Sequence, residues 1–165
     1  MKLMIKTVLK GVAVVLAISV VTILFLYLNR TNPYGIIPGR QLIEEEVTEP
    51  IEDWSFTEQY RTVTNEVRPS DPYSVNTSKL LLDGVLYIPS GKGDKSRWAQ
   101  YLIQDPNMRL RLGTKLYPVT ATWVEDPALL AQLREAYDKK FARPPGEERT
   151  PEELARFSFF RIDSR

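Results

Sequence analysis

The sequence predicts a small, mainly antiparallel β-domain of the α+β class, preceded by one transmembrane helix. Two observations predict the sheet: short runs rich in β-branched and aromatic residues, and two-residue turns between such runs at Asp83-Gly84 and Gly113-Thr114. A third predicts the membrane helix, because residues 8–28 (VLKGVAVVLAISVVTILFLYL) contain a single charge, Lys10. Few helical patterns interrupt the strands, which favours a small barrel with helices packed at its openings.

The composition excludes several classes of active site. The chain has 165 residues with no cysteine and no histidine, so disulfides, thiolate nucleophiles, Ser-His-Asp triads and histidine-based metal sites are excluded. Lys and Arg number 22 against 21 Asp and Glu, a net charge of +1. Residues 1–30 hold 4 of these cations and no acid, so the remaining chain has 18 cations against 21 acids, a net charge of −3. That balance is not typical of nucleic-acid-binding proteins, and no nucleic-acid partner is expected.

Residues 1–30 are predicted to be a cytoplasmic tail and an uncleaved transmembrane signal anchor. The apolar run is long enough to cross a hydrocarbon core of about 30 Å. The alternative is a cleaved signal peptide, but its apolar region is normally about 7–15 residues long, and the matching Ala17-x-Ser19 lies inside the run. Lys2 and Lys6 precede residues 8–28, and Lys10 lies near the start of that stretch, before its uncharged run. They predict a single-pass protein of the inner or plasma membrane, with a cytoplasmic N-terminus and a periplasmic or extracellular C-terminal domain.

Residues 31–40 are expected to be a linker, because they are rich in turn-forming residues, and residues 41–165 to be one domain. The strands expected in this domain are an edge strand at 47–56, a strand at 60–67, a hairpin of 73–82 with 85–89, a hairpin of 108–112 with 115–124, and a final strand at 157–162. Apolar residues alternate with Arg109 and Arg111, which predicts one buried face and one solvated, cationic face.

Three helices are predicted in the same domain. The spacing of Trp98, Leu102 and Ile103 predicts a short helix that ends at Asp105-Pro106. The main helix is expected to begin with Asp126 as its N-cap and Pro127 at its first position. It is expected to stop at Pro144-Pro145-Gly146, and a capping box from Thr150 to Glu153 opens the third helix.

The stretch Ser90 to Arg97 (SGKGDKSR) is the main candidate for binding chemistry. It places three cations, two glycines and two hydroxyls between a predicted strand and a predicted helix. Backbone N–H groups at a helix start, with Lys and Arg beside them, form a site for phosphate or another anion. The alternative is a solvated surface loop, because charge runs are usually exposed. The triplet Glu44-Glu45-Glu46 is typical of a solvated segment, and no metal site is expected there.

A spaced set of residues resembles the split β-barrel flavin-binding superfamily, over about residues 40–163. The set is Asp83-Gly84, Leu86-Tyr87, Ser90, Gly91, Arg97-Trp98, Leu102, Asp105-Pro106, Gly113, Leu116-Tyr117, Asp126-Pro127 and Phe159-Phe160-Arg161. The superfamily includes pyridoxamine-phosphate oxidase-like proteins, and the likeness is greatest to its deazaflavin-dependent nitroreductase branch. The resemblance therefore implies a small antiparallel split β-barrel with packed helices.

The same resemblance implies a cofactor, either flavin mononucleotide (FMN) or the deazaflavin coenzyme F420, and a homodimer with cofactors at its interface. The loop that holds the cofactor phosphate in the family matches Ser90, Lys92, Lys95 and Arg97 here, and Trp98 borders the site. The chain departs from the pattern at Tyr101, where many members have asparagine. It also lacks the family's proline ahead of the tryptophan.

Three functions follow as alternatives. The first is a membrane-anchored flavin- or deazaflavin-binding oxidoreductase-like protein. The second is a non-catalytic ligand- or partner-binding split barrel outside the membrane, and the third is a structural accessory domain without a ligand. The absence of histidine and cysteine does not discriminate among them, because in flavin redox chemistry the cofactor moves the hydride and the protein supplies position and electrostatics. Trp54 and Trp123 are expected to be core or groove aromatics.

Overall fold

The computed structural model describes residues 2–142 and 149–165, and the chain divides into two units, residues 1–31 and 32–165. The first unit contains helix α1 (Lys2–Leu28). Its segment Val8–Leu28 is long and apolar enough to cross a membrane, by length and composition. Every side chain of that segment is exposed.

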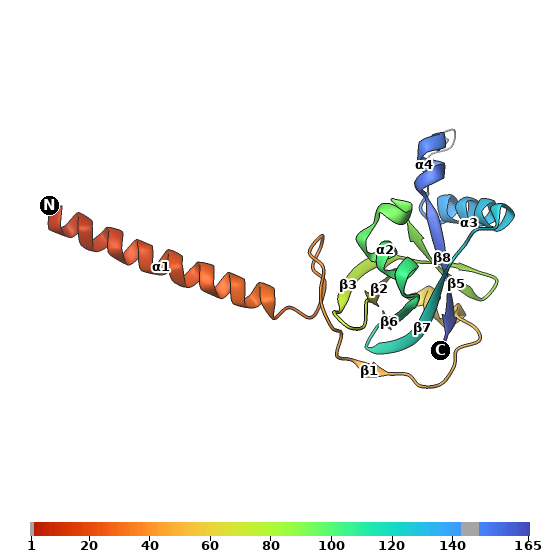
Figure 1. Cartoon of the computed structure of the whole chain (residues 1–165), viewed down its shortest axis with the longest axis horizontal. Helices are drawn as coiled ribbons and strands as arrows, with labels where there is room; N and C mark the ends of the chain where they lie inside the picture. The colour runs from red at the N-terminus through yellow and green to blue at the C-terminus, as the bar shows by residue number, and fades with distance from the viewer. Residues whose placement is uncertain (1, 143–148) are drawn as a thin grey trace. The chain divides into compact units, whose positions relative to one another are not determined.

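The second unit is a curled, mainly antiparallel sheet with the order β3-β2-β6-β7-β8-β5-β4 (Figure 1). Its strands are β2 (Thr62–Val67), β3 (Tyr73–Ser78), β4 (Leu80–Leu82), β5 (Val85–Ser90), β6 (Asn107–Leu112), β7 (Lys115–Trp123) and β8 (Ser158–Ser164). A short β1 (Glu45–Glu46) pairs with β7 in parallel. Although β3 and β4 are the two ends of the sheet order, only Lys79 separates them in the sequence. The sheet therefore curls until the chain itself links its two edges, which confirms the predicted fold class.

Both predicted hairpin turns are present. Asp83 and Gly84 have φ angles of 51° and 77°, as a type I′ turn requires, and Leu82 pairs with Val85 across them. In the second hairpin Gly113 has a φ of 60°. Leu112 pairs with Lys115 there, so two residues connect β6 to β7.

In the described part of this unit, three helices and two 3-10 turns accompany the sheet: α2 (Arg97–Gln104), α3 (Pro127–Lys140), α4 (Pro151–Arg156), η1 (Ser55–Gln59) and η2 (Gly93–Lys95). The Asp126 carboxylate accepts hydrogen bonds from the backbone N–H groups of Ala128 and Leu129, at 3.1 and 3.3 Å, which confirms the predicted N-cap. The predicted capping box is also present at the start of α4. Residues Pro144-Pro145-Gly146 lie outside the described residues, and α3 ends before them.

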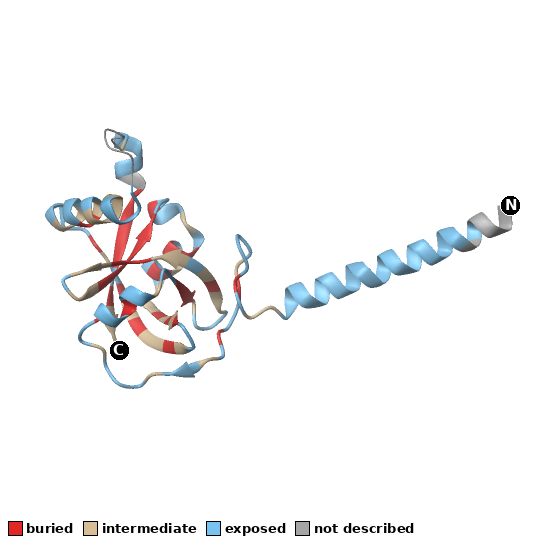
Figure 2. Ribbon diagram, turned by 180° about the vertical axis from the view of Figure 1, so that it is seen from behind, coloured by how far each residue is buried: buried red, intermediate tan, exposed pale blue. Residues whose placement is uncertain are grey.

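Among the described residues, two clusters of buried side chains form the core. Figure 2 marks the buried residues in red along the ribbon. The larger cluster fills the inside of the curled sheet with residues from β2, β5, β6, β7, β8 and α2. The smaller one packs α3 against β4, β5 and β8 through Leu80, Tyr87, Val124, Leu133, Phe157 and Phe159. Helix α2 instead contacts β2 and β3. The helices therefore cover two different parts of the sheet.

The prediction of an edge strand over 47–56 is wrong. Most of this segment is irregular, and from Ser55 it forms η1. The Asp53 carboxylate accepts hydrogen bonds from the N–H and the hydroxyl of Ser55, at 2.8 and 2.6 Å. Such local side-chain bonds compete with a strand ladder and favour a turn. Trp54 is 2 % exposed and belongs to the main core, so the turn covers the barrel instead of extending its edge.

The strand predicted over 73–82 is two strands. It breaks at Lys79 because the chain changes partner there: β3 pairs with β2, whereas β4 pairs with β5. The final strand, β8, extends to Ser164, two residues beyond the prediction.

The outer face of β6 is not the solvated cationic face that the alternation predicted. Met108, Leu110 and Leu112 are buried as expected. Residues 41–47 cover the two arginines that alternate with these apolar residues. Each glutamate of the acidic triplet forms an ion pair with a cation of β6 or β7: Glu44 with Arg111 at 2.6 Å, Glu45 with Lys115 at 2.5 Å and Glu46 with Arg109 at 2.6 Å. Burial disfavours the charged form of Glu44, but the hydrogen bond and charge of Arg111, together with backbone hydrogen bonds, outweigh it and lower the pKa of Glu44.

Candidate functional site

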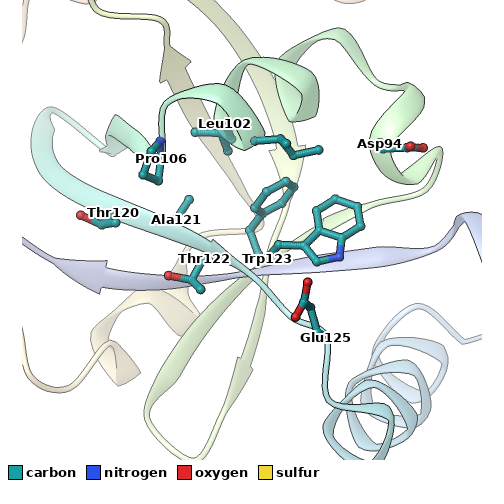
Figure 3. Close-up of a pocket in the computed structure, with 10 residues that line it drawn as sticks. Asp94, Leu102, Pro106, Thr120, Ala121, Thr122, Trp123 and Glu125 are labelled. Carbon is teal, nitrogen blue, oxygen red and sulfur yellow. The ribbon is translucent and has the colours of Figure 1, made fainter.

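A cavity of about 550 Å³ opens between α2 and β7 (Figure 3). Its size falls within the range of about 300–1,000 Å³ that is typical of small-molecule sites. The described residues that line it are Asp94, Leu102, Ile103, Pro106, Thr120, Ala121, Thr122, Trp123, Glu125 and Phe160.

The cavity exists because β7 is longer than β6. The first residue of β6, Asn107, pairs with Thr120, and the N–H of Ala121 donates to the carbonyl of Pro106 at 2.9 Å. Beyond that point β7 continues to Trp123, where it pairs with Phe160 of β8 on its other edge. The end of α2 occupies the place of the missing strand, as Figure 3 shows. A helix cannot continue the ladder, so a gap remains between the helix and the strand.

Aromatic rings form one wall of this gap. Trp123 meets Phe160 edge-on, with ring centroids 5.0 Å apart and planes at 86°. Phe160 is buried and is backed by Trp98, whose ring centroid lies 5.4 Å away. On the helix side, Ile103 is 54 % exposed. The wall is held rigidly by the core while part of its apolar surface stays open, which suits a planar apolar ligand.

The polar groups of the cavity are two hydroxyls and two carboxylates. The hydroxyls belong to Thr120 and Thr122, and neither bonds to another described residue. The carboxylates belong to Asp94 and Glu125, and no lysine or arginine is among the described residues that line the cavity. The cavity is therefore matched to a ligand part that is apolar or neutral, with groups that can hydrogen-bond to hydroxyls.

The loop from Ser90 to Arg97 lies beside this cavity, and Asp94 belongs to both. Ser90 is 2 % exposed, and its hydroxyl bonds to the carbonyl of Gly93 at 2.8 Å and to the hydroxyl of Ser96 at 2.9 Å. Gly93 has a φ of 55°, which permits the turn into η2. The buried hydroxyl of Ser90 therefore holds the loop conformation through these hydrogen bonds.

The three cations of the loop are exposed. Lys92, Lys95 and Arg97 form no ion pair or hydrogen bond with another described side chain, and Arg97 lies 6.0 Å from the ring centroid of Tyr73. They do not line the cavity. Cations without partners cost little to neutralise with an external anion, so this part of the loop suits a phosphate that approaches from solvent.

The structure thus separates the predicted site residues into two groups. Lys92, Lys95 and Arg97 lie together on the loop surface, whereas Ser90 and Trp98 are buried beneath it. The cavity residues of β7 were not predicted as site residues. In the sequence, Thr120, Thr122 and Trp123 have the pattern of an ordinary half-exposed strand. What distinguishes them is that β7 is three residues longer than its partner β6.

A buried lysine, Lys79, lies at the seam of the barrel, the point where the chain passes from β3 to β4 between the two ends of the sheet order. The side chain of Lys79 is fully buried, and its Nζ has no hydrogen-bond partner in the described part of the chain. Burial lowers the pKa of Lys79 to about 8; the charge of Lys140 adds to this shift and that of Glu58 opposes it. The Nζ of Lys140 donates to the backbone carbonyl of Lys79 at 3.1 Å, which ties α3 to the seam. No cluster of acidic residues that could hold a metal ion occurs among the described residues.

Comparisons with known proteins place the fold. No family model and no curated protein sequence matches the chain. A solved protein from Listeria innocua, provisionally described as a pyridoxamine 5′-phosphate oxidase, is similar with a TM-score of 0.53 and 19% identity, over 67% of this chain and 89% of that one. A conserved hypothetical protein from Mycobacterium tuberculosis is similar with a TM-score of 0.51 and 19% identity, over 73% and 86%. The domain therefore has the split β-barrel fold of pyridoxamine-phosphate oxidase-like proteins.

Proposed function

We propose that this protein is a membrane-anchored, flavin- or deazaflavin-binding oxidoreductase-like split barrel. One observation carries the proposal: an aromatic-walled cavity lies beside a loop with three exposed cations that form no ion pair or hydrogen bond with a described side chain. A flavin nucleotide has the same two parts, a planar ring system and a phosphate. The similarity to a protein described as a pyridoxamine 5′-phosphate oxidase supports the proposal through the fold.

The charges of the site favour one orientation of the bound ligand. Asp94 and Glu125 disfavour an anion inside the cavity, whereas the cations of the loop attract one outside it. The ring system would therefore lie against Trp123 and Phe160, with the hydroxyls of Thr120 and Thr122 available to its polar edge. Lys92, Lys95 and Arg97 would hold the phosphate. When bound, the cofactor would supply hydride transfer, and these residues would bind and orient it.

The alternative is a non-catalytic ligand-binding module that uses the same cavity. The absorption spectrum of the purified full chain, before and after dithionite, separates the two: a bound flavin or deazaflavin gives a band that reduction bleaches. Ile103→Ala should then weaken binding, because Ile103 is exposed at the cavity, whereas Ile43→Ala should not, because Ile43 is equally apolar, 79 % exposed and outside the cavity lining. Equal binding by both variants would contradict the cavity as the site.

The anchor is the second part of the proposal. The segment Val8–Leu28 supports a single membrane crossing, and the lysines before it support a cytoplasmic N-terminus with the barrel outside. A periplasmic-active reporter and a cytoplasmic-active reporter, each fused after Arg165, test this topology. Activity of the cytoplasmic reporter alone would contradict it, and release of the chain by alkaline carbonate would contradict the anchor.

A further inference from the structure

An apolar turn, residues 34–37, lies near the start of the barrel unit, shortly after the membrane-spanning segment in the sequence. Tyr34 and Ile37 exchange two backbone hydrogen bonds of 2.9 Å, and Gly35 has a φ of 55°, so the turn is tightly closed. Its side chains are not packed: Tyr34 is 82 % exposed, Ile36 is 102 % exposed and Ile37 is 40 % exposed. Three large, exposed apolar side chains thus lie within four residues, and such a concentration of exposed apolar surface favours an external partner.

The base of the turn is fixed to the barrel. Pro33 is buried. Gly39 exchanges two backbone hydrogen bonds with Ser74 of β3, at 2.8 and 3.2 Å, and the side chain of Asn32 accepts a hydrogen bond from Arg111 of β6. Because both ends are held while the tip is exposed, the turn presents its apolar side chains in a defined place.

We propose that the turn 34–37 inserts into the headgroup layer of the bilayer that α1 crosses, as a second and interfacial membrane contact. This rests on the proposed anchor. Five residues lie between Leu28 and Tyr34, so even a fully extended chain keeps the turn within about 20 Å of the end of the span. The tether keeps the local concentration of the bilayer surface high, so a small apolar patch is enough for contact.

The chemistry of the turn matches that surface. Tyrosine is enriched where hydrocarbon meets water, and aliphatic side chains add buried apolar area at the same depth. Arg30 lies between the span and the turn in the sequence, and cations close to a bilayer are attracted to anionic headgroups. The contact would hold the barrel at the membrane by two points, the helix and the turn.

The natural absence of cysteine permits a direct test on the full chain. Ile36→Cys and Gln132→Cys, an exposed position on α3, are each labelled with the polarity-sensitive dye NBD and reconstituted in vesicles of phosphatidylcholine and phosphatidylglycerol. The dye at 36 should emit further to the blue than the dye at 132, and nitroxides attached near the lipid headgroups should quench it more strongly. Identical emission and quenching at the two positions would overturn the proposal.

Two further readouts separate this proposal from the anchor and from a protein partner. If carbonate extracts the chain from the vesicles, the anchor itself fails. If the chain is retained and the dye at 36 stays in water, only the turn proposal fails. Efficient disulfide formation between unlabelled Ile36→Cys chains, together with a blue shift that nitroxide lipids do not quench, would assign the turn to a second copy of the chain and overturn the lipid contact.

Discussion

The guanidinium of Arg109 binds the carboxylate of Glu66 through two hydrogen bonds of 2.8 Å, from Nε to Oε1 and from Nη2 to Oε2. Glu66 is 4 % exposed, and its carboxylate also accepts the backbone N–H of Leu42. The same guanidinium donates to the carbonyl of Leu42 at 2.9 Å. This pair, which joins β2 to β6, therefore also holds the chain that precedes β1 against the barrel.

Glu66→Gln should lower the free energy of unfolding by about 2–4 kcal/mol, because it leaves a largely buried guanidinium with one carboxylate fewer. Glu45→Gln is the matched control: it removes an exposed pair with Lys115, which solvent screens, and should change the stability little. Urea unfolding of the full chain in detergent, followed by tryptophan fluorescence, measures both. Equal losses would show that the buried pair contributes no more than a surface pair.

Gly84→Ala should destabilise the hairpin of β4 and β5. The φ of 77° costs an L-residue about 1–2 kcal/mol, and an added Cβ would lie 3.0 Å from Oδ1 of Asp53. That oxygen cannot move freely because it accepts two hydrogen bonds from Ser55. Gly91→Ala is the control, since its Cβ would meet Phe157 at an ordinary 3.8 Å. A melting temperature for Gly84→Ala equal to that of Gly91→Ala would contradict the turn geometry.

Lys79 should make stability rise with pH. Its pKa is about 8 in the folded protein against 10.5 in the unfolded chain, so between these values the unfolded chain binds more protons and deprotonation favours folding. Below pH 8 the buried charge costs on the order of 3 kcal/mol. Lys79→Met should therefore be more stable at neutral pH and lose most of this rise, since only the smaller contribution of Lys140, whose pKa burial also lowers, remains. Lys139→Met, on an exposed residue, should keep the rise. Unfolding free energies between about pH 7 and pH 9.5, below the titration of ordinary tyrosines, measure the effect.

A stability that stays constant over that range in the unmodified chain would contradict the burial of an unpaired ammonium group at the seam. The same conclusion would follow if Lys79→Met and Lys139→Met had the same pH dependence.

Local signals in the sequence predicted the parts of the fold that depend on local physics. Asp83-Gly84 specifies its turn because both residues tolerate a positive φ, and Asp126-Pro127 specifies a helix start through a side-chain acceptor and a preset φ. The alternation around Met108, Leu110 and Leu112 predicted the buried face of β6. Each of these signals lies within a few residues.

Features that depend on distant residues were not predictable in this way. The break at Lys79 reflects a change of strand partner, and neither partner is visible in the local pattern. The arginines of β6 were predicted to be solvated because two of their glutamate partners are distant in the sequence. Glu46, which pairs with Arg109, and Glu44, which pairs with Arg111, each lie more than 60 residues away from the arginine. Likewise, the cavity depends on where β6 ends relative to β7, which only the register of the assembled sheet determines.

The most direct test of the proposed function is a titration of FMN and coenzyme F420 against the full chain, the double variant Lys92→Ala/Arg97→Ala and the control Lys139→Ala. Charge-assisted hydrogen bonds contribute about 1.5–3 kcal/mol each, and each 1.4 kcal/mol is about tenfold in affinity. The double variant should therefore bind the preferred cofactor about 100-fold more weakly or worse, with unchanged stability of the empty protein, because both side chains are exposed. The control should bind like the unmodified chain. Failure of the unmodified chain to bind either cofactor at high micromolar concentration would contradict the account.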